Sequence, residues 1–313
     1  MLDSGDFESV EALLPEENML KAKIADFERE FKTNVEKYRI TIDTDKIYQS
    51  ISQLTKIPTS TLSADEKKNL ANINQMLKES IVGQDEAIDL ICRSIKRNKM
   101  GLGNQNKVIA SYLLAGSTGV GKTYLAKKIA EKVFGNEKYL VRFDMSEYAD
   151  KTSMNKLIGA NSGYVGYENG GLLTEALKNN PYCVLLIDEV EKANSDIFNV
   201  FLQILDEGVL TDNTGNHINC KNTIVLFTSN IGAQKADALG NGIGFNTDSN
   251  TNTKTILEKE LKALFKPEFL NRLDQVVYFN SLTEENYEKI VELEIGKVQK
   301  QVQTIGYDIT YND

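Results

Sequence analysis

Residues 116–123 read Gly-Ser-Thr-Gly-Val-Gly-Lys-Thr, and no other segment constrains the fold of this chain as strongly. The apolar run 111–115 precedes them, and residues 124–130 follow with apolar side chains at helical spacing. A short buried strand, a glycine-rich turn ending in Gly-Lys-Thr and a helix form the local structure of a phosphate-binding loop. The sequence therefore predicts a strand, a phosphate-binding loop and a helix in this order.

Each residue type in this loop has a physical reason. Gly116, Gly119 and Gly121 let the backbone curl so that successive N–H groups point at one phosphate, beside a positively polarised helix N-terminus. Lys122 is expected to reach the β- and γ-phosphates, and the Thr123 hydroxyl is expected to ligate Mg²⁺. The expected nucleotide contacts of the loop are Gly116, Ser117, Thr118, Gly119, Val120, Gly121, Lys122, Thr123 and Tyr124. Glycine-rich turns between a strand and a helix also occur without a ligand.

A second nucleotide-binding signature ends the apolar run 183–187, which Asp188 and Glu189 follow directly. Ligands of parallel sheets bind at the carboxyl ends of the strands, so this acid pair is expected beside the phosphate-binding loop. Asp188 is placed to hold Mg²⁺ through its water shell, and Glu189 to polarise a water that attacks the γ-phosphate. Two adjacent acids can also simply begin a helix, because they complement its dipole.

Composition narrows the possible functions. The chain carries 36 Lys and Arg against 45 Asp and Glu, a net charge of −9, which argues against nucleic acid as a partner. Cys92, Cys183 and Cys220 are odd in number and widely spaced, so we expect reduced thiols and no metal site. No apolar span is long enough for a bilayer and the N-terminus is acidic, so we expect no membrane partner and a cytoplasmic, organelle-stroma or matrix location.

The pattern along the chain predicts an α/β fold in which helices cover both faces of a parallel sheet, a three-layer nucleotide-binding domain. Strands are expected at 111–115, 139–143, 183–187 and 223–228, and an exposed mobile loop at 241–252. The predicted domains are a helical or coiled-coil segment at 1–38, with a break at Leu14-Pro15, a linker with a short strand and helices at 39–79, the large domain at 80–281, and an incomplete small α/β lid at 282–313.

Taken together, four segments resemble the AAA+ ATPases of the Clp family of protein unfoldases, in particular their second ATPase ring. They are Gly-Ser-Thr-Gly-Val-Gly-Lys-Thr, Leu-Leu-Ile-Asp-Glu-Val-Glu-Lys-Ala, Leu-Phe-Thr-Ser-Asn and Phe-Lys-Pro-Glu-Phe-Leu-Asn-Arg-Leu-Asp. The resemblance covers residues 39 to about 310 and implies a P-loop AAA+ domain that hydrolyses ATP with Mg²⁺. It also implies a homo-oligomeric, hexameric ring that threads unfolded polypeptide through a central pore.

The resemblance assigns further residues to the ATP site. It implies that Asn230 positions the attacking water and that Arg272 is an arginine finger delivered by the neighbouring subunit. A guanidinium in this place neutralises charge on the transferred phosphoryl group. Ile81 and Val82 match the pair that contacts adenine, and two exposed β-branched side chains are expected to form an apolar slot for the base.

Two loops carry implied binding roles. Tyr164 and Val165, flanked by glycines, match the pore loop that grips substrate, although an ordinary turn with a half-buried tyrosine has the same pattern. Ile243, Gly244 and Phe245 resemble the tripeptide that docks into a Clp peptidase, or they anchor their own loop. The acidic N-terminal helix resembles a middle domain that serves adaptors. The alternatives are a nucleotide-binding scaffold with weak catalysis and a disaggregase that works without a peptidase.

The sequence also departs from the family pattern. It ends before the rest of the lid, and no arginine follows Arg272, so we expect slow hydrolysis if no further segment follows. His217, the only histidine, is expected in a loop and without a catalytic role, because phosphoryl transfer needs no imidazole.

Overall fold

The computed structural model describes residues 7–37, 42–62, 66–150, 152–159, 170–231 and 249–307. The chain divides into two compact units, 1–47 and 48–313, and each is described by itself. Among the described residues, no helix combines the length and apolar character that spanning a membrane requires. The predicted domain boundaries stay predictions.

The first unit contains one long helix, α1 (Phe7–Lys37). The break predicted at Leu14-Pro15 is wrong, because α1 continues through Pro15. A proline removes one backbone hydrogen bond, and the rest of this 31-residue helix tolerates that local loss. The apolar residues Leu20, Ile24, Phe27 and Phe31, which follow one another at steps of three and four along α1, are exposed. The strand predicted at 39–42 lies outside the described residues except for Ile42, which is not in a strand.

Five parallel strands form the sheet of the second unit, in the order β2-β3-β6-β1-β7. Their bounds are β1 (Ala110–Ala115), β2 (Leu140–Asp144), β3 (Cys183–Asp188), β6 (Thr223–Ser229) and β7 (Gln275–Tyr278). The four predicted strands are confirmed to within one residue at each end. The edge strand β7 was not predicted, since four residues are too few for a clear pattern.

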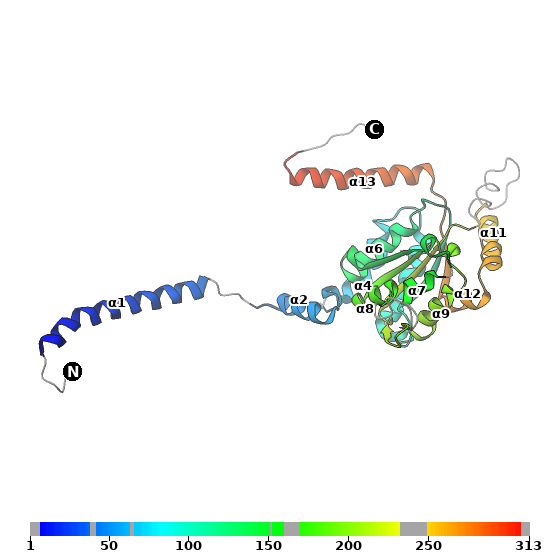
Figure 1. Cartoon of the computed structure of the whole chain (residues 1–313). Coiled ribbons are helices and arrows are strands. Elements are labelled where there is room, and N and C mark those ends of the chain that lie inside the picture. The colour runs from blue at the N-terminus through cyan, green and yellow to red at the C-terminus, as the bar shows by residue number, and fades with distance from the viewer. Residues whose placement is uncertain are drawn as a thin grey trace. The chain divides into compact units, whose positions relative to one another are not determined.

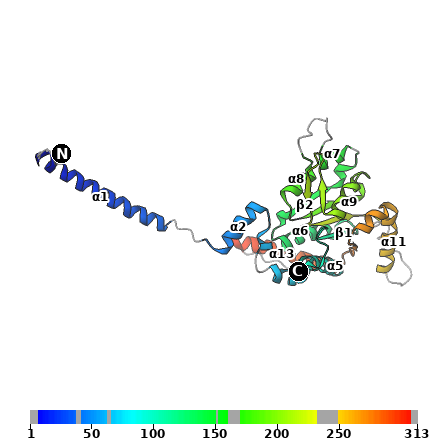
Figure 2. The same ribbon diagram turned by 90° about the horizontal axis from the view of Figure 1, so that it is seen from below.

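Helices cover both faces of this sheet, as Figure 1 shows for α6 and α9 and Figure 2 shows from below. One face packs against α4 (Glu66–Lys78), α5 (Asp85–Arg97) and α6 (Lys122–Phe134). The other packs against α7 (Ser153–Ile158), α8 (Leu172–Asn179), α9 (Ile197–Glu207), α11 (Ser249–Leu264) and α12 (Pro267–Arg272). Alternate residues of each central strand belong to opposite cores: in β3, Leu185 and Ile187 face one layer while Val184 and Leu186 face the other. The predicted three-layer α/β architecture is confirmed.

The chain has several further elements. They are α2 (Thr44–Thr55), α3 (Thr59–Leu62), the π-helical turn η2 (Asn98–Leu102), the 3₁₀ turns η3 (Glu137–Tyr139), η4 (Met145–Tyr148) and η5 (Val190–Lys192), and α13 (Glu284–Thr304). Thr283 caps α13 by accepting a hydrogen bond from the Asn286 N–H. The predicted mobile loop is wrong at 249–252, which begins α11, and its other residues lie outside the described ones.

A small hairpin corrects the expectation for His217. This residue lies in β5 (His217–Asn219), which pairs in antiparallel fashion with β4 (Val209–Thr211). Asp212 Oδ1 closes the turn by accepting hydrogen bonds from the Thr214 and Asn216 N–H groups. Strands of three residues leave too little alternation to be read from sequence.

The buried amide of Gln84 fastens the phosphate-binding loop to the end of the sheet. Gln84 is 1% exposed. Its Nε2 donates to the carbonyls of Asn280 (2.9 Å) and Val120 (3.3 Å), and its Oε1 accepts from the Asn280 N–H (3.0 Å). One side chain thus ties the segment before α5 to the loop and to the chain after β7.

We expect Gln84→Met, which keeps the length and removes the amide, to lower the free energy of unfolding by about 1–3 kcal/mol, because buried backbone groups lose their partners. Urea unfolding followed by circular dichroism measures it. Gln75→Met is the control, since this exposed amide only donates to Glu79 and its loss is expected to cost less than about 0.5 kcal/mol. Equal effects of both substitutions would contradict the role of Gln84.

Candidate functional site

The loop at 116–123 joins β1 to α6 with two glycines in the left-handed region. Gly119 has φ of 84° and Gly121 has φ of 102°, and a Cβ on either would meet no atom within 4 Å. Backbone conformation, and not crowding, therefore requires glycine at these two positions. Gly116 differs, because a Cβ there would lie 2.9 Å from Phe279 Cβ. The loop carries the chain into the N-terminus of α6, whose first N–H groups have no partner within the helix.

Lys122 opens α6 and is 7% exposed. Its Nζ donates to the carbonyls of Gly116 and Ser117, both at 2.7 Å, and to Asn230 Oδ1 at 2.8 Å. Burial lowers the pKa of the ammonium to about 8. Nearby carboxylates act in the opposite direction on this pKa. Lys122 is thus a desolvated cation inside the loop.

Asp188 ends β3 and is buried, with 8% exposure. Its Oδ2 accepts from Arg142 Nε (3.0 Å) and lies 2.7 Å from Nη2 of the same guanidinium. Its Oδ1 accepts from the Thr228 hydroxyl. Sequence reasoning missed Arg142, although an arginine inside the otherwise apolar strand Leu-Val-Arg-Phe is a signal for a buried partner.

Glu189 follows Asp188 with a positive φ of 51°, which is uncommon for a residue other than glycine. Its N–H donates to the Thr228 hydroxyl at 3.0 Å, so one hydroxyl holds both members of the acid pair. Its Oε2 accepts from Ser146 Oγ (2.9 Å) and pairs with Lys192 Nζ (2.8 Å). Hydrogen bonds from Lys192 and Ser146 hold the pKa of the Glu189 carboxyl below its usual value.

Asn230 joins the two signatures. It follows β6, and its amide accepts from Lys122 Nζ at 2.8 Å and donates to Glu189 Oε1 at 3.3 Å. The strand order explains why Asn230 contacts both residues, because β6 lies between β1 and β3 and all three strands are parallel. The loop, the acid pair and Asn230 therefore emerge at one edge of the sheet.

The other predicted nucleotide contacts lie in different surroundings. Ile81 is 4% exposed and packs in the core with α5 and α6, so the prediction that it is exposed is wrong; Val82 is half-buried. Tyr124 in α6 accepts a hydrogen bond from Lys297 of α13 at 2.9 Å. Arg272 ends α12 with its side chain 45% exposed, in an ion pair of 3.0 Å with Asp206 of α9.

Several expectations are not tested by this structure. Tyr164, Val165, Ile243, Gly244 and Phe245 lie outside the described residues. Cys92, Cys183 and Cys220 are free and buried. The described residues contain no group of three or more His, Cys, Asp and Glu arranged for a metal. Thr123 lies half-buried in the first turn of α6.

The residues present fit a nucleotide phosphate. Left-handed glycines, an ammonium and a helix N-terminus all meet in the same short loop, and each favours an anion. A hydroxyl (Thr123) and a carboxylate (Asp188) are the oxygen donors that Mg²⁺ prefers when phosphates and water complete its shell. The Asp188 carboxylate is already engaged by Arg142, so outer-shell contact through water suits it better than direct ligation.

Comparison with known proteins gives consistent matches. A family model described as AAA domain (Cdc48 subfamily) matches residues 107–276, more than half of the chain. The chain is 42% identical over 305 residues to a chaperone protein ClpB of Malacoplasma penetrans, covering 96% of this chain and 41% of that protein. It is 45% identical over 264 residues to the ATP-dependent Clp protease ATP-binding subunit ClpE of Lactococcus lactis, covering 84% and 35%.

A solved structure, the S. cerevisiae Hsp104-ADP complex, is similar with a TM-score of 0.72 and 38% identity. The match covers 84% of this chain and 44% of that one. The chain thus spans less than half the length of these three proteins.

We expect Thr228→Val to lower the free energy of unfolding by about 2 kcal/mol or more, because a buried Asp188 oxygen and the Glu189 N–H both lose their partner. Thr223→Val is the matched control on the same strand, since the buried Thr223 hydroxyl faces no partner stronger than the Cys183 thiol. Denaturant unfolding compares the two. Similar losses would show that the Thr228 hydroxyl does not hold the acid pair.

Proposed function

Because the chain belongs to the family described as AAA domain (Cdc48 subfamily), we propose that it binds and hydrolyses ATP with Mg²⁺ as the motor module of a Clp-type protein unfoldase. The observation that carries the proposal is the contact of Asn230 with both Lys122 and Glu189. A phosphate-binding cation and a carboxylate suited to activate water are linked through a single amide. A loop that only binds an anion would not need the carboxylate or the amide that links it to the cation.

The loop residues 116–124 would hold the phosphates. Lys122 would exchange its bonds to the Gly116 and Ser117 carbonyls for the β- and γ-phosphate oxygens, which bear full charges. Thr123 and Asp188 would hold Mg²⁺, which when bound neutralises phosphate charge. Val82, with the backbone beside buried Ile81, would contact the base.

Glu189 and Asn230 would act on the attacking water. Glu189 is ionised at neutral pH, as a glutamate with its ordinary pKa already is, so its carboxylate can accept a proton from water as attack begins. Asn230 would orient the same water, because its amide already lies between this carboxylate and the ammonium. Both roles place charge and dipoles before the reaction starts.

The proposed partners rest on the resemblance to the same family. Arg272, exposed at the end of α12, would reach the nucleotide of a neighbouring copy in a hexameric ring. Tyr164 and Val165 would grip unfolded polypeptide, and Ile243, Gly244 and Phe245 would dock a Clp peptidase. The similar proteins carry both ClpB and Clp-protease names, so a disaggregase that works without a peptidase is the second candidate.

We expect Glu189→Gln to keep ATP affinity within about threefold and to lower turnover by about 10²-fold or more, since the amide cannot accept the proton. Phosphate release and a fluorescent nucleotide titration measure the two quantities. Glu147→Gln is the control, an exposed acid in η4. Turnover that stays at the wild-type rate in Glu189→Gln would remove Glu189 from this role.

The lowered pKa of Lys122 predicts that the affinity for ATP depends on pH. Its pKa of about 8 means that most of the free chain loses this cation by pH 9, so affinity for a triphosphate should fall about tenfold between pH 7 and pH 9. Isothermal titration with a non-hydrolysable ATP analogue tests this. Lys122→Arg keeps a permanent charge and should show a flat profile; the same decline in both proteins would assign it to another group.

The proposed role of Arg272 predicts that ATP turnover depends on assembly of the ring. Turnover per chain should rise with protein concentration, and Arg272→Ala should lower the plateau about 10³-fold, because the charge on the transferred phosphoryl group is no longer neutralised. Arg93→Ala, an exposed arginine of α5, is the control. Turnover that is independent of concentration and insensitive to Arg272→Ala would contradict delivery from a neighbouring subunit.

A further inference from the structure

Glu191 contacts the ATP site through the backbone of Asn230. It lies in η5, just after the acid pair, and its Oε1 accepts a hydrogen bond from the backbone N–H of Asn230 at 3.0 Å. This bond crosses from the end of β3 to the end of β6. The Asn230 side chain contacts Lys122 and Glu189, so Glu191 holds the backbone from which that contact is made.

Among the described residues, two other hydrogen bonds flank Asn230 in this turn. The Ser229 carbonyl accepts from the Gly116 N–H (3.3 Å), and Ser229 Oγ accepts from the Ile231 N–H (3.2 Å). Neither bond involves the backbone of Asn230 itself. Among the described residues, the Glu191 carboxylate is thus the hydrogen-bond partner of the Asn230 backbone from which that side chain extends.

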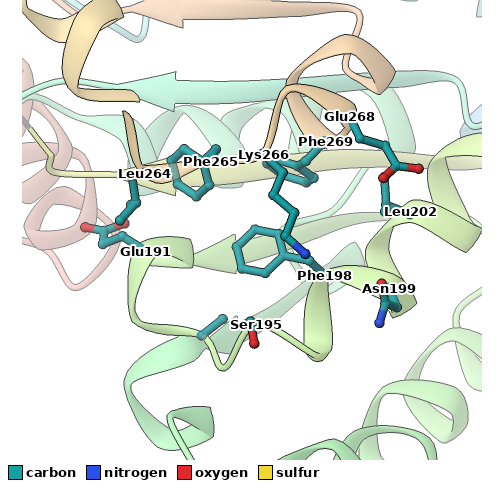
Figure 3. A pocket seen from close by; sticks show the side chains of 11 residues that line it. Glu191, Ser195, Phe198, Asn199, Leu202, Leu264, Phe265, Lys266, Glu268 and Phe269 are labelled. Carbon is teal, nitrogen blue, oxygen red and sulfur yellow. The ribbon is translucent and has the colours of Figure 1, made fainter. Parts of the chain in front are cut away.

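Glu191 also forms the end of a cavity of about 240 Å³ on the face of the sheet covered by α9, α11 and α12. Its second oxygen, Oε2, is buried without a hydrogen-bond partner among the described residues. Figure 3 shows Glu191 beside Leu264 at one end of the lining, and Glu268 beside Phe269 at the other. Phe198 and Phe265 line the space between them.

We propose that Glu191 is a positioning residue for ATP hydrolysis, which fixes the backbone of Asn230 and through it the water-orienting amide; this inference rests on the proposed function. Glu191 contacts neither Lys122 nor Glu189 by a hydrogen bond. The Glu191 carboxylate also raises the pKa of the Lys122 ammonium more than either Asp188 or Glu189 does, which agrees with a position close to the phosphate-binding loop.

Kinetic measurements distinguish a positioning role of Glu191 from a merely structural one. Glu191→Ala should lower kcat for ATP about tenfold to a hundredfold and leave KM within about twofold, because misplacement of one catalytic group affects the reaction more than binding. Glu191→Gln keeps an acceptor oxygen and should retain kcat within about threefold. In an Asn230→Ala background, Glu191→Ala should cost less than about twofold, since both changes remove the same contribution. Glu268→Ala, at the other end of the cavity, should leave kcat unchanged.

A second measurement works without turnover. Hydrogen exchange at the Asn230 amide, read on the nucleotide-free full chain, should be about tenfold or more faster in Glu191→Ala and close to wild type in Glu191→Gln and Glu268→Ala. Unchanged exchange in Glu191→Ala overturns the proposal. Faster exchange with unchanged kcat in an active chain overturns the positioning role. Absence of turnover in the wild-type chain contradicts the proposed function, and the exchange experiment still decides whether Glu191 holds Asn230.

Discussion

The side chain of Asn230 is the interaction on which the rest of the site depends, because it contacts a cation from one loop and a carboxylate from another. Its amide lies 2.8 Å from Lys122 Nζ and 3.3 Å from Glu189 Oε1. The strand between β1 and β3 is well placed to supply such a group, and in this sheet that strand is β6. The topology thus sets the chemistry, since the carboxyl ends of parallel strands all lie at the same edge of the sheet.

Burial of charge is the cost of this arrangement, and the surrounding network compensates for it. Lys122 is almost fully buried, and three oxygen acceptors receive its ammonium. Asp188 is buried as well, and Arg142 and Thr228 satisfy its carboxylate. A buried charge that loses its partner destabilises the fold strongly, so these pairs keep a site rich in charge compatible with a stable sheet. A phosphate entering the loop would replace carbonyl partners of Lys122 with stronger ones.

Much of this could be predicted from the sequence where a pattern is long or chemically distinctive. The apolar runs predicted four of the five strands of the main sheet to within one residue at each end, and the Gly-Lys-Thr and Asp-Glu segments predicted the loop and the acid pair. Contacts made by tertiary packing could not be read in the same way. Ile81 looks like an exposed contact in sequence, yet it is buried in the core.

Single side chains that act at a distance along the chain were also missed. Arg142 lies 46 residues before its partner Asp188, and Gln84 lies 196 residues before Asn280. Glu191 has a third such role, visible only when the ends of β3 and β6 are side by side. Proline had the opposite effect, because a strong local signal at Pro15 predicted a break that the helix does not have.

The most direct test of the central claim is an experimental structure of this chain with Mg²⁺ and a non-hydrolysable ATP analogue. The account predicts that Lys122 Nζ leaves the Gly116 and Ser117 carbonyls for the phosphates, and that the γ-phosphate lies within one water of both Asn230 and Glu189. An analogue bound with Lys122 still on those carbonyls, or with its γ-phosphate out of reach of Asn230, would contradict it.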